Sequence, residues 1–403
     1  MQADIHQAPP QEDVIAGRRS WLATAFSILL IGIVGNATIA VSPLLVSGMS
    51  EYLGFGDAYL GELAGAASAG ASLSTVAALF FLDRVGWPLR KTAFFALLLY
   101  AAANSVLPTL FDRSGWLLLA FFVSGCASGL IWAISATAIT TLPNTGRLVS
   151  IFYGTPYLTG LAIQPLMPSL YARWGVAPAF ELIALACVLS LLTLRWFPAR
   201  AIGAPPLAKG DPANSRRRRG LAWLILLPVA ISLLLQYIAN SGLWIYFDRV
   251  GLVAGHSHQM SANVVALGSG MALVGTLLAT TLAPKLRPIL AISAISMVMA
   301  LATLGLLGAE NYLLFAGSVF LFNAMITFIT PFFFILLSQL PVSPGRAVLV
   351  GNLAMMAGFA AGPFLIGRMA DGGDFTVSIY ATSTMLLVSA LIAIANRALG
   401  KSR

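Results

Sequence analysis

Long runs of apolar residues, separated by short polar stretches, dominate the chain. Twelve of them approach or exceed the roughly 20 residues that a helix needs to cross a bilayer. Lipid offers no partner to a free backbone N–H or C=O, so each run is predicted to be a helix. The runs are continuous rather than alternating with a period of two, which excludes a transmembrane β-barrel. The predicted spans are 21–46, 57–82, 92–110, 115–141, 148–171, 176–196, 221–247, 259–283, 287–308, 312–340, 346–370 and 375–396.

Lys and Arg are distributed unevenly over the loops between these spans. With the N-terminus in the cytoplasm, 19 of the 23 basic residues fall on the inner side. The outer side holds the other four, Arg113, Arg173, Arg249 and Arg368. Cytoplasmic loops of membrane proteins carry such an excess of Lys and Arg. The chain is therefore predicted to lie in the inner cell membrane with both termini in the cytoplasm.

The longest polar stretch divides the chain into two halves. Residues 198–220 hold several prolines and the run Arg216-Arg217-Arg218-Arg219, which is typical of a flexible linker. The Arg run either anchors the seventh span on the inner side or binds anionic lipid heads. The predicted organisation is a tail at 1–20, a six-helix bundle at 21–197, the linker, a second bundle at 221–396 and a tail at 397–403.

The two halves resemble each other. The pairs Gly146-Arg147 and Gly345-Arg346 lie 199 residues apart, and each opens a helix rich in Gly and Pro. Internal repetition at half the chain length is typical of transporters.

The composition excludes several classes of protein. Hydrophobic residues make up 59% of the chain and charged residues 9%, whereas soluble domains carry about 25% charged residues. A soluble enzyme and a nucleic-acid-binding domain are thereby disfavoured, and the net charge of +9 is interpreted as membrane topology. Cys126 and Cys187 lie within apolar runs and are interpreted as small buried hydrophobic residues.

A charged motif follows the second predicted span. Leu82-Asp83-Arg84-Val85-Gly86-Trp87-Pro88-Leu89-Arg90-Lys91 resembles the loop between helices 2 and 3 of the major facilitator superfamily. The family's leading Gly is absent, and Trp87 replaces a basic residue. The resemblance covers the whole chain and implies an all-α membrane protein with twelve helices in two pseudo-symmetric bundles. The residues that match the motif are Asp83, Arg84, Gly86, Arg90 and Lys91.

A carboxylate that faces cations on the next turn forms charge-assisted hydrogen bonds. Asp83 with its basic neighbours is therefore predicted to latch the two halves together on the inner side. The alternative is that the cations only anchor the topology and Asp83 caps a turn. The equivalent loop of the second half, 282–287, contains no acid.

Two further elements bear on direction and coupling. Gly358-Phe359-Ala360-Ala361-Gly362-Pro363 resembles an element that exporters of this superfamily carry on helix 5, whereas span 5 has Gln164 in place of the second Gly. Export is thus slightly favoured, and simple close packing of the glycines is the alternative. The Arg that many proton-coupled members carry on helix 4 is missing around Gly125, which weakens proton antiport by that route.

The resemblance implies that helices 1, 4, 7 and 10 line a central cavity. Polar residues recur at helical spacing on these spans, and burying polar groups is costly unless they are partnered, so their faces are expected to point inward. For each residue the alternative is a hydrogen bond between helices. The predicted cavity residues are Asn36, Ser128, Trp132, Tyr157, Gln164, Gln236, Tyr237, Asn240, Trp244, Asn323 and Thr327.

This lining is neutral, so the predicted substrate is a small neutral, lipophilic or aromatic solute. Glu62, one to two turns into span 2, is the candidate proton carrier; the alternative is a solvated carboxylate near the membrane surface. His256 and His258 lack further ligands nearby, so no metal site is predicted.

The leading hypothesis is a secondary transporter that works by alternating access, is coupled to protons and favours export slightly. The alternatives are an uptake permease or facilitator for a small organic nutrient and, in a different class, a membrane-embedded sensor or enzyme. No His lies within a span and no phosphate-binding loop of the ATPase type occurs, so neither an enzyme nor ATP-driven transport is expected. We expect a monomer without cofactors, whose partners are the solute, protons and the lipid bilayer but no nucleic acid.

Overall fold

The computed structural model describes residues 11–82, 87–142, 145–200, 216–340, 344–370 and 372–401. This part of the chain is built from α-helices and short 3₁₀ turns. The helices before the long polar stretch are α1 (Gln11–Gly35), α2 (Ala37–Ala40), α3 (Ser42–Leu53), α4 (Asp57–Phe81), α5 (Leu89–Val106), α6 (Ser114–Ile139), α7 (Thr145–Ile163), α8 (Met167–Trp174) and α9 (Ala177–Ser190). Those after it are α10 (Arg216–Trp244), α11 (Phe247–Val253), α12 (His258–Leu282), α13 (Pro288–Gly305), α14 (Tyr312–Ser338), α15 (Pro344–Met369) and α16 (Thr376–Lys401).

The twelve predicted spans are confirmed, although three of them are broken helices. The first consists of α1, α2 and α3, the fifth of α7 and α8, and the seventh of α10 and α11. Within the described residues, nine helices are by themselves long and apolar enough to cross a membrane. The second span, α4, is a single helix rich in Gly, Ala and Ser.

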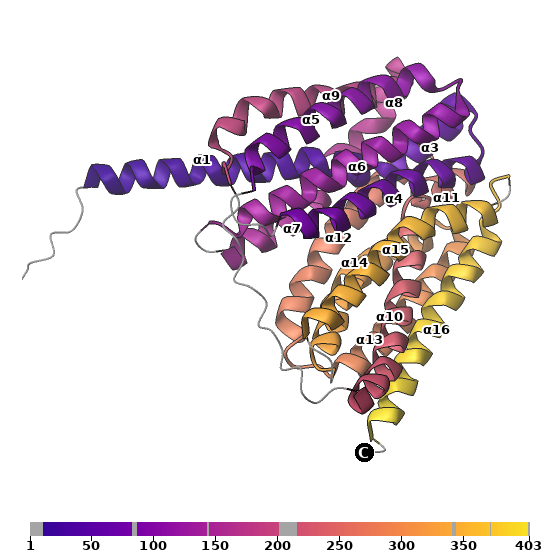
Figure 1. The fold of residues 1–403 in the computed structure, drawn as a ribbon. Helices are drawn as coiled ribbons and strands as arrows, with labels where there is room; N and C mark the ends of the chain where they lie inside the picture. The colour runs from indigo at the N-terminus through magenta and orange to yellow at the C-terminus, as the bar shows by residue number, and fades with distance from the viewer. Residues whose placement is uncertain are drawn as a thin grey trace, which may run out of the picture.

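The helices form two lobes, which we call the first lobe (α1–α9) and the second lobe (α10–α16). Within the first lobe α6 packs against α4 and α5; within the second lobe α15 packs against α10, and α14 against α12. The lobes meet mainly through α4 with α15 and through α7 with α12. Figure 1 shows that the lobes converge where α3, α8 and α11 lie and diverge toward the opposite side. We call the first side the closed end.

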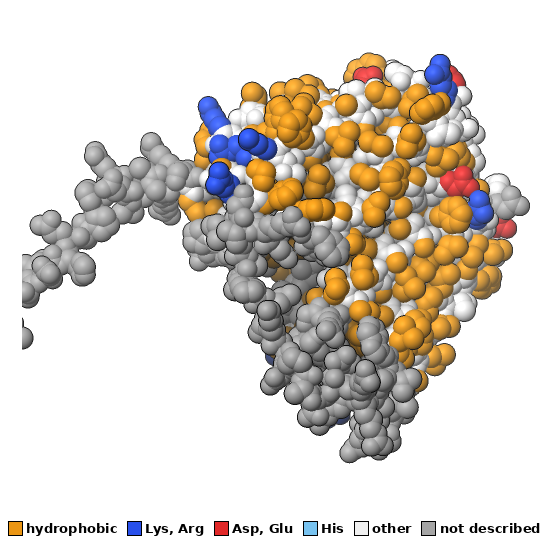
Figure 2. Space-filling model, viewed as in Figure 1, with side chains coloured by type: hydrophobic (Ala, Val, Ile, Leu, Met, Phe, Trp, Pro, Cys, Tyr) orange, Lys and Arg blue, Asp and Glu red, His pale blue; other side chains and the backbone are white. Residues whose placement is uncertain are grey.

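The two ends of the molecule differ in their charged side chains. Arg90, Lys91 and Arg195 of the first lobe and Lys285 and Arg287 of the second lie at the diverging end, which we call the basic end. Figure 2 shows Lys and Arg side chains grouped at one end of the first lobe, which is the upper one in this view, and acidic side chains beside basic ones at its other end.

The sides of the molecule between these ends are largely apolar. Figure 2 shows hydrophobic side chains spread over this surface. The exposed large hydrophobic residues include Phe95 at 67%, Leu192 at 72% and Leu277 at 66%. Exposed apolar surface on this scale is unfavourable in water and is what a hydrocarbon solvent requires. The protein is therefore a multi-pass membrane protein.

Candidate transport cavity and closed end

A pocket lies between the two lobes. It is lined by α2, α3, α4, α5 and α6 of the first lobe and by α10 and α15 of the second. The empty space among these residues is about 690 Å³, part of it open to the surroundings. This lies within the range of about 300–1,000 Å³ that is usual for small-molecule sites.

The lining combines hydroxyl groups with aromatic and aliphatic side chains. Lys, Arg, Asp, Glu and His are absent from the described residues that line the pocket. An ionised solute would leave its hydration there without meeting a counter-charge, which is costly. The polar members are Thr38, Ser42, Ser68, Tyr100, Ser124, Ser128 and Ser241, and the other aromatic ones are Phe121, Trp244 and Phe359.

Most of the pocket hydroxyls whose contacts are defined already bond to the protein. The Ser128 hydroxyl donates to the Gly35 carbonyl at 2.6 Å, and the Ser241 hydroxyl donates to the Tyr237 carbonyl at 2.8 Å. Ser42 differs, because its buried hydroxyl has no hydrogen-bond partner among the residues that the structure describes. A buried hydroxyl without a partner is costly, so Ser42 is the pocket residue best placed to bind a polar group of a solute.

The broken first span places Ser42 in the pocket. Pro43 has no N–H to continue a helical hydrogen-bond ladder, and α3 begins beside it at Ser42. The Gln164 side chain, at the break of the fifth span, donates to the Ala40 carbonyl at 2.7 Å. A polar side chain thus satisfies a carbonyl at the break, which is how non-helical backbone is tolerated at membrane depth.

The structure brings two of the predicted cavity residues, Ser128 and Trp244, into the pocket lining. Asn36 lies at the break between α1 and α2, and its side-chain oxygen is buried without a described partner. Trp132 stacks on Phe152 with ring centroids 4.2 Å apart. Tyr157 on α7 and Asn240 on α10 are half-buried.

Gln164, also predicted to line the cavity, bonds to Ala40 within the first lobe. The other four predicted cavity residues bond within the second lobe. Gln236 donates to the Met299 sulfur at 2.9 Å and accepts from Ser296 at 3.2 Å. Thr327 donates to the Ala272 carbonyl at 2.7 Å. The hydroxyls of Tyr237 and Thr330 lie 3.1 Å apart, and Asn323 donates to the Val319 carbonyl at 2.8 Å. These bonds satisfy polar groups between or along the helices of one lobe.

The predicted inner latch falls mostly on residues that are not described. Asp83, Arg84 and Gly86 lie outside the described residues, so the latch stays a prediction. Arg90 donates from Nε at 2.8 Å and from Nη2 at 2.6 Å to the Phe197 carbonyl. It thereby ties α5 to the end of the sixth span within the first lobe. Lys91 is exposed.

The glycines of the 358–363 element lie at a helix crossing. A Cβ on Gly358 would meet the backbone of Leu234 and Ile238 on α10, and a Cβ on Gly362 would meet Ile238 and Gly242. The element therefore lets α15 approach α10 closely, as the packing interpretation requires.

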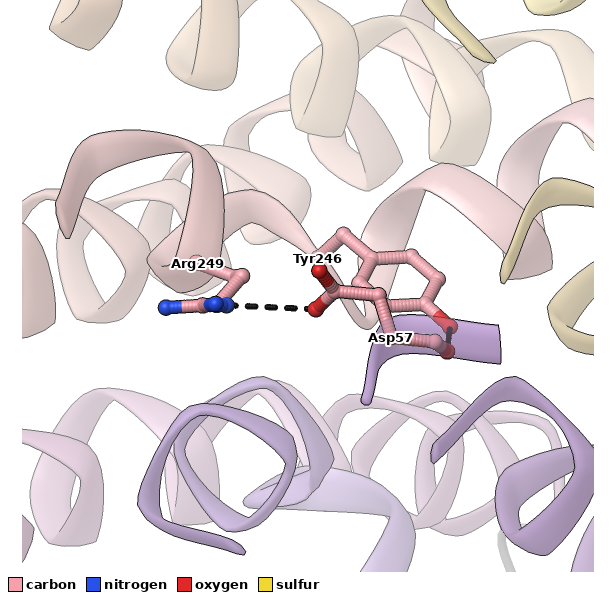
Figure 3. Close-up of polar contacts among 3 residues, drawn as sticks. All are labelled: Asp57, Tyr246 and Arg249. Atoms are coloured by element: carbon pink, nitrogen blue, oxygen red, sulfur yellow. Dashed lines mark hydrogen bonds and ion pairs between the residues drawn. The ribbon is translucent and has the colours of Figure 1, made fainter. Parts of the chain in front are cut away.

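Ion pairs connect the lobes at the closed end. Arg249 of α11 donates from Nε to Asp57 Oδ1 of α4 at 3.1 Å, and the Tyr246 hydroxyl donates to the Asp57 carbonyl at 2.8 Å (Figure 3). Asp57 is buried, with 5% of its surface exposed. A second pair joins Arg368 of α15 to Glu62 of α4 at 3.0 Å, with both side chains partly exposed.

Asp248, the neighbour of Arg249, is an acid of a different kind. It is 2% exposed, and its Oδ1 has no hydrogen-bond partner among the described residues. It lies in α11, the second part of the broken seventh span. A buried carboxylate without a cation is costly, and binding a proton removes its charge. The sequence alone predicted no role for Asp57 or Asp248; its only signal was an acid beside a base where the seventh span ends.

Two helical lobes around an uncharged pocket, with several spans broken near it, define the class of two-lobed membrane transporters. The family model of the Major Facilitator Superfamily matches residues 21–363, and the chain belongs to this family. Twelve helices in this fold are thereby established.

Solved structures share the fold at low sequence identity. A D-xylose-proton symporter matches with a TM-score of 0.73 and 16% identity, covering 92% of this chain and 97% of its own. The nucleoside transporter NupG, solved as a point mutant, matches with a TM-score of 0.70 and 13% identity, covering 93% and 99%. A bacterial homologue of the human drug peptide transporters PepT1 and PepT2 matches with a TM-score of 0.70 and 11% identity, covering 94% and 99%. Comparison with curated proteins gives no match.

Proposed function

We propose that the protein carries a neutral, weakly polar or aromatic organic solute across the membrane by alternating access and that this transport is coupled to protons. The observation that carries the solute class is the pocket between the lobes, whose described lining offers hydroxyls and aromatic rings but no ionisable acid or base. Rings give a large apolar contact, and a few hydroxyls orient the polar part of a ligand.

We assign the basic end to the cytoplasm, because Lys and Arg accumulate on that side of membrane proteins. Both termini then lie inside, as the sequence predicts for an inner-membrane protein. The closed end faces outward, and the structure corresponds to an inward-facing state. In such a state the solute exchanges with the cytoplasm while the ion pairs of Arg249 and Arg368 hold the outer side shut.

The direction of transport has two candidates. Export is slightly favoured by the resemblance of the 358–363 element, but the close packing of those glycines against α10 accounts for the same residues. Uptake is favoured by the likeness in fold to a D-xylose-proton symporter. Flux into sealed vesicles of the two opposite orientations, under a proton gradient of known direction, separates the two.

The solute class is tested by binding to the purified protein in detergent. A thermal-shift screen against neutral, cationic and anionic small molecules should yield neutral, ring-bearing hits. For such a hit, Ser42→Ala should weaken binding about fivefold, which corresponds to the ~1 kcal/mol of one hydrogen bond.

Ser135→Ala is the matched control. Its buried hydroxyl also lacks a partner among the described residues, but Ser135 is not part of the pocket lining. Equal losses of affinity in both variants, or hits confined to charged compounds, would contradict the proposal.

A further inference from the structure

Two buried acids lie at the outer junction of the lobes, and only one of them has a cation among the described residues. Asp57 pairs with Arg249 at 3.1 Å. Asp248 precedes Arg249 in the sequence, but the guanidinium of Arg249 is turned toward Asp57 (Figure 3). Asp248 is nevertheless 2% exposed. A buried carboxylate without a cation is costly, and a carboxyl group avoids this cost by binding a proton.

The surroundings of Asp248 contain further unpartnered polar atoms. Asp248, Ser47 and Tyr171 line one small pocket, and Asp248 Oδ1, Ser47 Oγ and the Tyr171 hydroxyl are buried without hydrogen-bond partners among the described residues. Each lobe contributes to this pocket, the first through α3 and α8 and the second through α11 and α12. It therefore exists as a buried site only while the lobes are closed at this end.

The other titratable groups around the pocket do not supply a dedicated cation. From α3 come Glu51 and Tyr52, from α8 comes Tyr171, and from α12 comes His258. His258 Nε2 lies 3.0 Å from Glu51 Oε1. When His258 is protonated, its positive charge is therefore paired with the Glu51 carboxylate. Both Glu51 and His258 are exposed by more than a third of their side chains, which places them in contact with water.

We propose that Asp248 is a proton-binding site whose occupancy is coupled to closure of the outer side. The proton comes from outer water as the lobes meet, binds to a carboxylate oxygen of Asp248 and gives a neutral acid. When the lobes separate, the same proton returns to water and the carboxylate is hydrated. This inference rests on the alternating access of the proposed function, because it requires an outward-open state.

The direction of the pH effect follows from the difference between the two states. In the closed state Asp248 is buried without a cation, whereas in the open state its carboxyl is hydrated. The closed state therefore binds the proton more tightly. Its advantage is complete at a pH low enough to protonate the hydrated carboxyl and is lost as the pH rises and the carboxyl ionises in both states. The ratio of closed to open molecules therefore falls as the pH rises.

Closure is measured directly by the distance between spin labels on the two lobes. Trp174→Cys on α8 and Leu313→Cys on α14 place labels at exposed positions of the closed end, in protein whose Cys126 and Cys187 are replaced. In protein without solute, the short-distance population should shrink as the pH rises. Asp248→Asn, which imitates the neutral acid, should keep the short distance throughout. A pH response that persists in Asp248→Asn overturns the proposal.

Asp57→Asn is the matched control, because it changes the paired acid by the same substitution. It should favour the long distance at every pH and keep the pH response. Infrared difference spectra between acidic and neutral buffer should show a protonated carboxyl band that Asp248→Asn lacks. The absence of such a band from the unmodified protein would also overturn the proposal.

Two further measurements show whether a negative result refutes the proton site or the proposed transport function. Exchange of Na⁺ for K⁺ at constant pH should leave the distances unchanged; a Na⁺-dependent shift would assign the pocket to a metal cation and overturn the proton. The distance and infrared measurements need no substrate. A normal pH response in a protein that transports no neutral solute would therefore refute the proposed function while supporting the proton site.

Discussion

Arg249 and Asp57 lie 192 residues apart in the sequence and 3.1 Å apart in space, in opposite lobes. Asp57 is the first residue of α4, where the helix dipole favours a negative charge. Its backbone carbonyl accepts the Tyr246 hydroxyl, so α4 is held by two groups that flank the start of α11. The pair thus couples the position of a helix in the first lobe to the broken seventh span of the second.

Breaking this pair should open the outer side. Arg249→Gln leaves the Asp57 carboxylate buried without its cation, which costs the closed state about 2 kcal/mol and lowers the closed population about 30-fold relative to the open one. The spin-label distance between positions 174 and 313 reports this change. The double variant Asp57→Arg with Arg249→Asp should recover part of the closure. A distance distribution identical to that of the unmodified protein would show that the pair does not hold the lobes together.

Glu62→Gln should have a much smaller effect on closure. Glu62 and Arg368 are 29% and 59% exposed, and such water-exposed pairs contribute about 1 kcal/mol or less. The sequence makes Glu62 the candidate proton carrier, whereas the combination of burial and missing cation occurs at Asp248 among the described residues. We expect proton-driven transport by Glu62→Gln to stay within about fivefold of the unmodified rate, which is the most that a weak surface pair contributes. Complete loss of the response to a proton gradient, with normal solute binding, would instead support Glu62 as the proton carrier.

The fold was predictable because lipid leaves few choices. A continuous apolar run of sufficient length has to be a helix, and the unequal loop charges favour an even number of spans. The breaks were not placed by the same reasoning. Pro43 and Pro165 mark two of them in the sequence, but a broken helix also needs a partner for its freed carbonyl. That partner, Gln164 for Ala40, lies 124 residues away.

The site was predictable only in part. Periodicity showed that Gln236 and Asn240 lie on one helical face, but not which neighbour that face meets. In the structure Gln236 meets Ser296 and Met299 of α13, while Ser128 and Trp244 reach the pocket. The pairing of Arg249 with Asp57 depends on how the two lobes dock, which local sequence patterns do not encode.

Gln236→Ala should therefore destabilise the second lobe more than it changes solute affinity. The substitution removes a fully buried amide and leaves the Ser296 hydroxyl without its acceptor, a loss of about 1–3 kcal/mol. Melting temperature in detergent measures the loss of stability, and a separate titration measures Kd. Asn240→Ala, one turn further along α10 and half-buried, is the control with an expected smaller loss of stability. A large rise in Kd for Gln236→Ala at unchanged melting temperature would instead place Gln236 in the substrate site.

Gly125→Ala should impair both packing and solute binding. Gly125 on α6 faces the backbone of Ala67 on α4, where a Cβ would overlap the Ala67 carbonyl, and both residues line the pocket. Backbone cannot move aside as a flexible side chain does, so the methyl group should push α4 and α6 apart and cost about 1–3 kcal/mol. A lower melting temperature together with weaker binding of the hit compound is expected.

Gly317→Ala provides the comparison, because a Cβ there meets nothing within 4 Å and Gly317 is not part of the pocket lining. Alanine is the better helix former by about 1 kcal/mol, so this variant should be as stable as the unmodified protein or slightly more so. Affinity should not change. If both glycine variants behave alike, the effect at Gly125 arises from helix propensity rather than from the close contact of α4 with α6, and that contact does not shape the pocket.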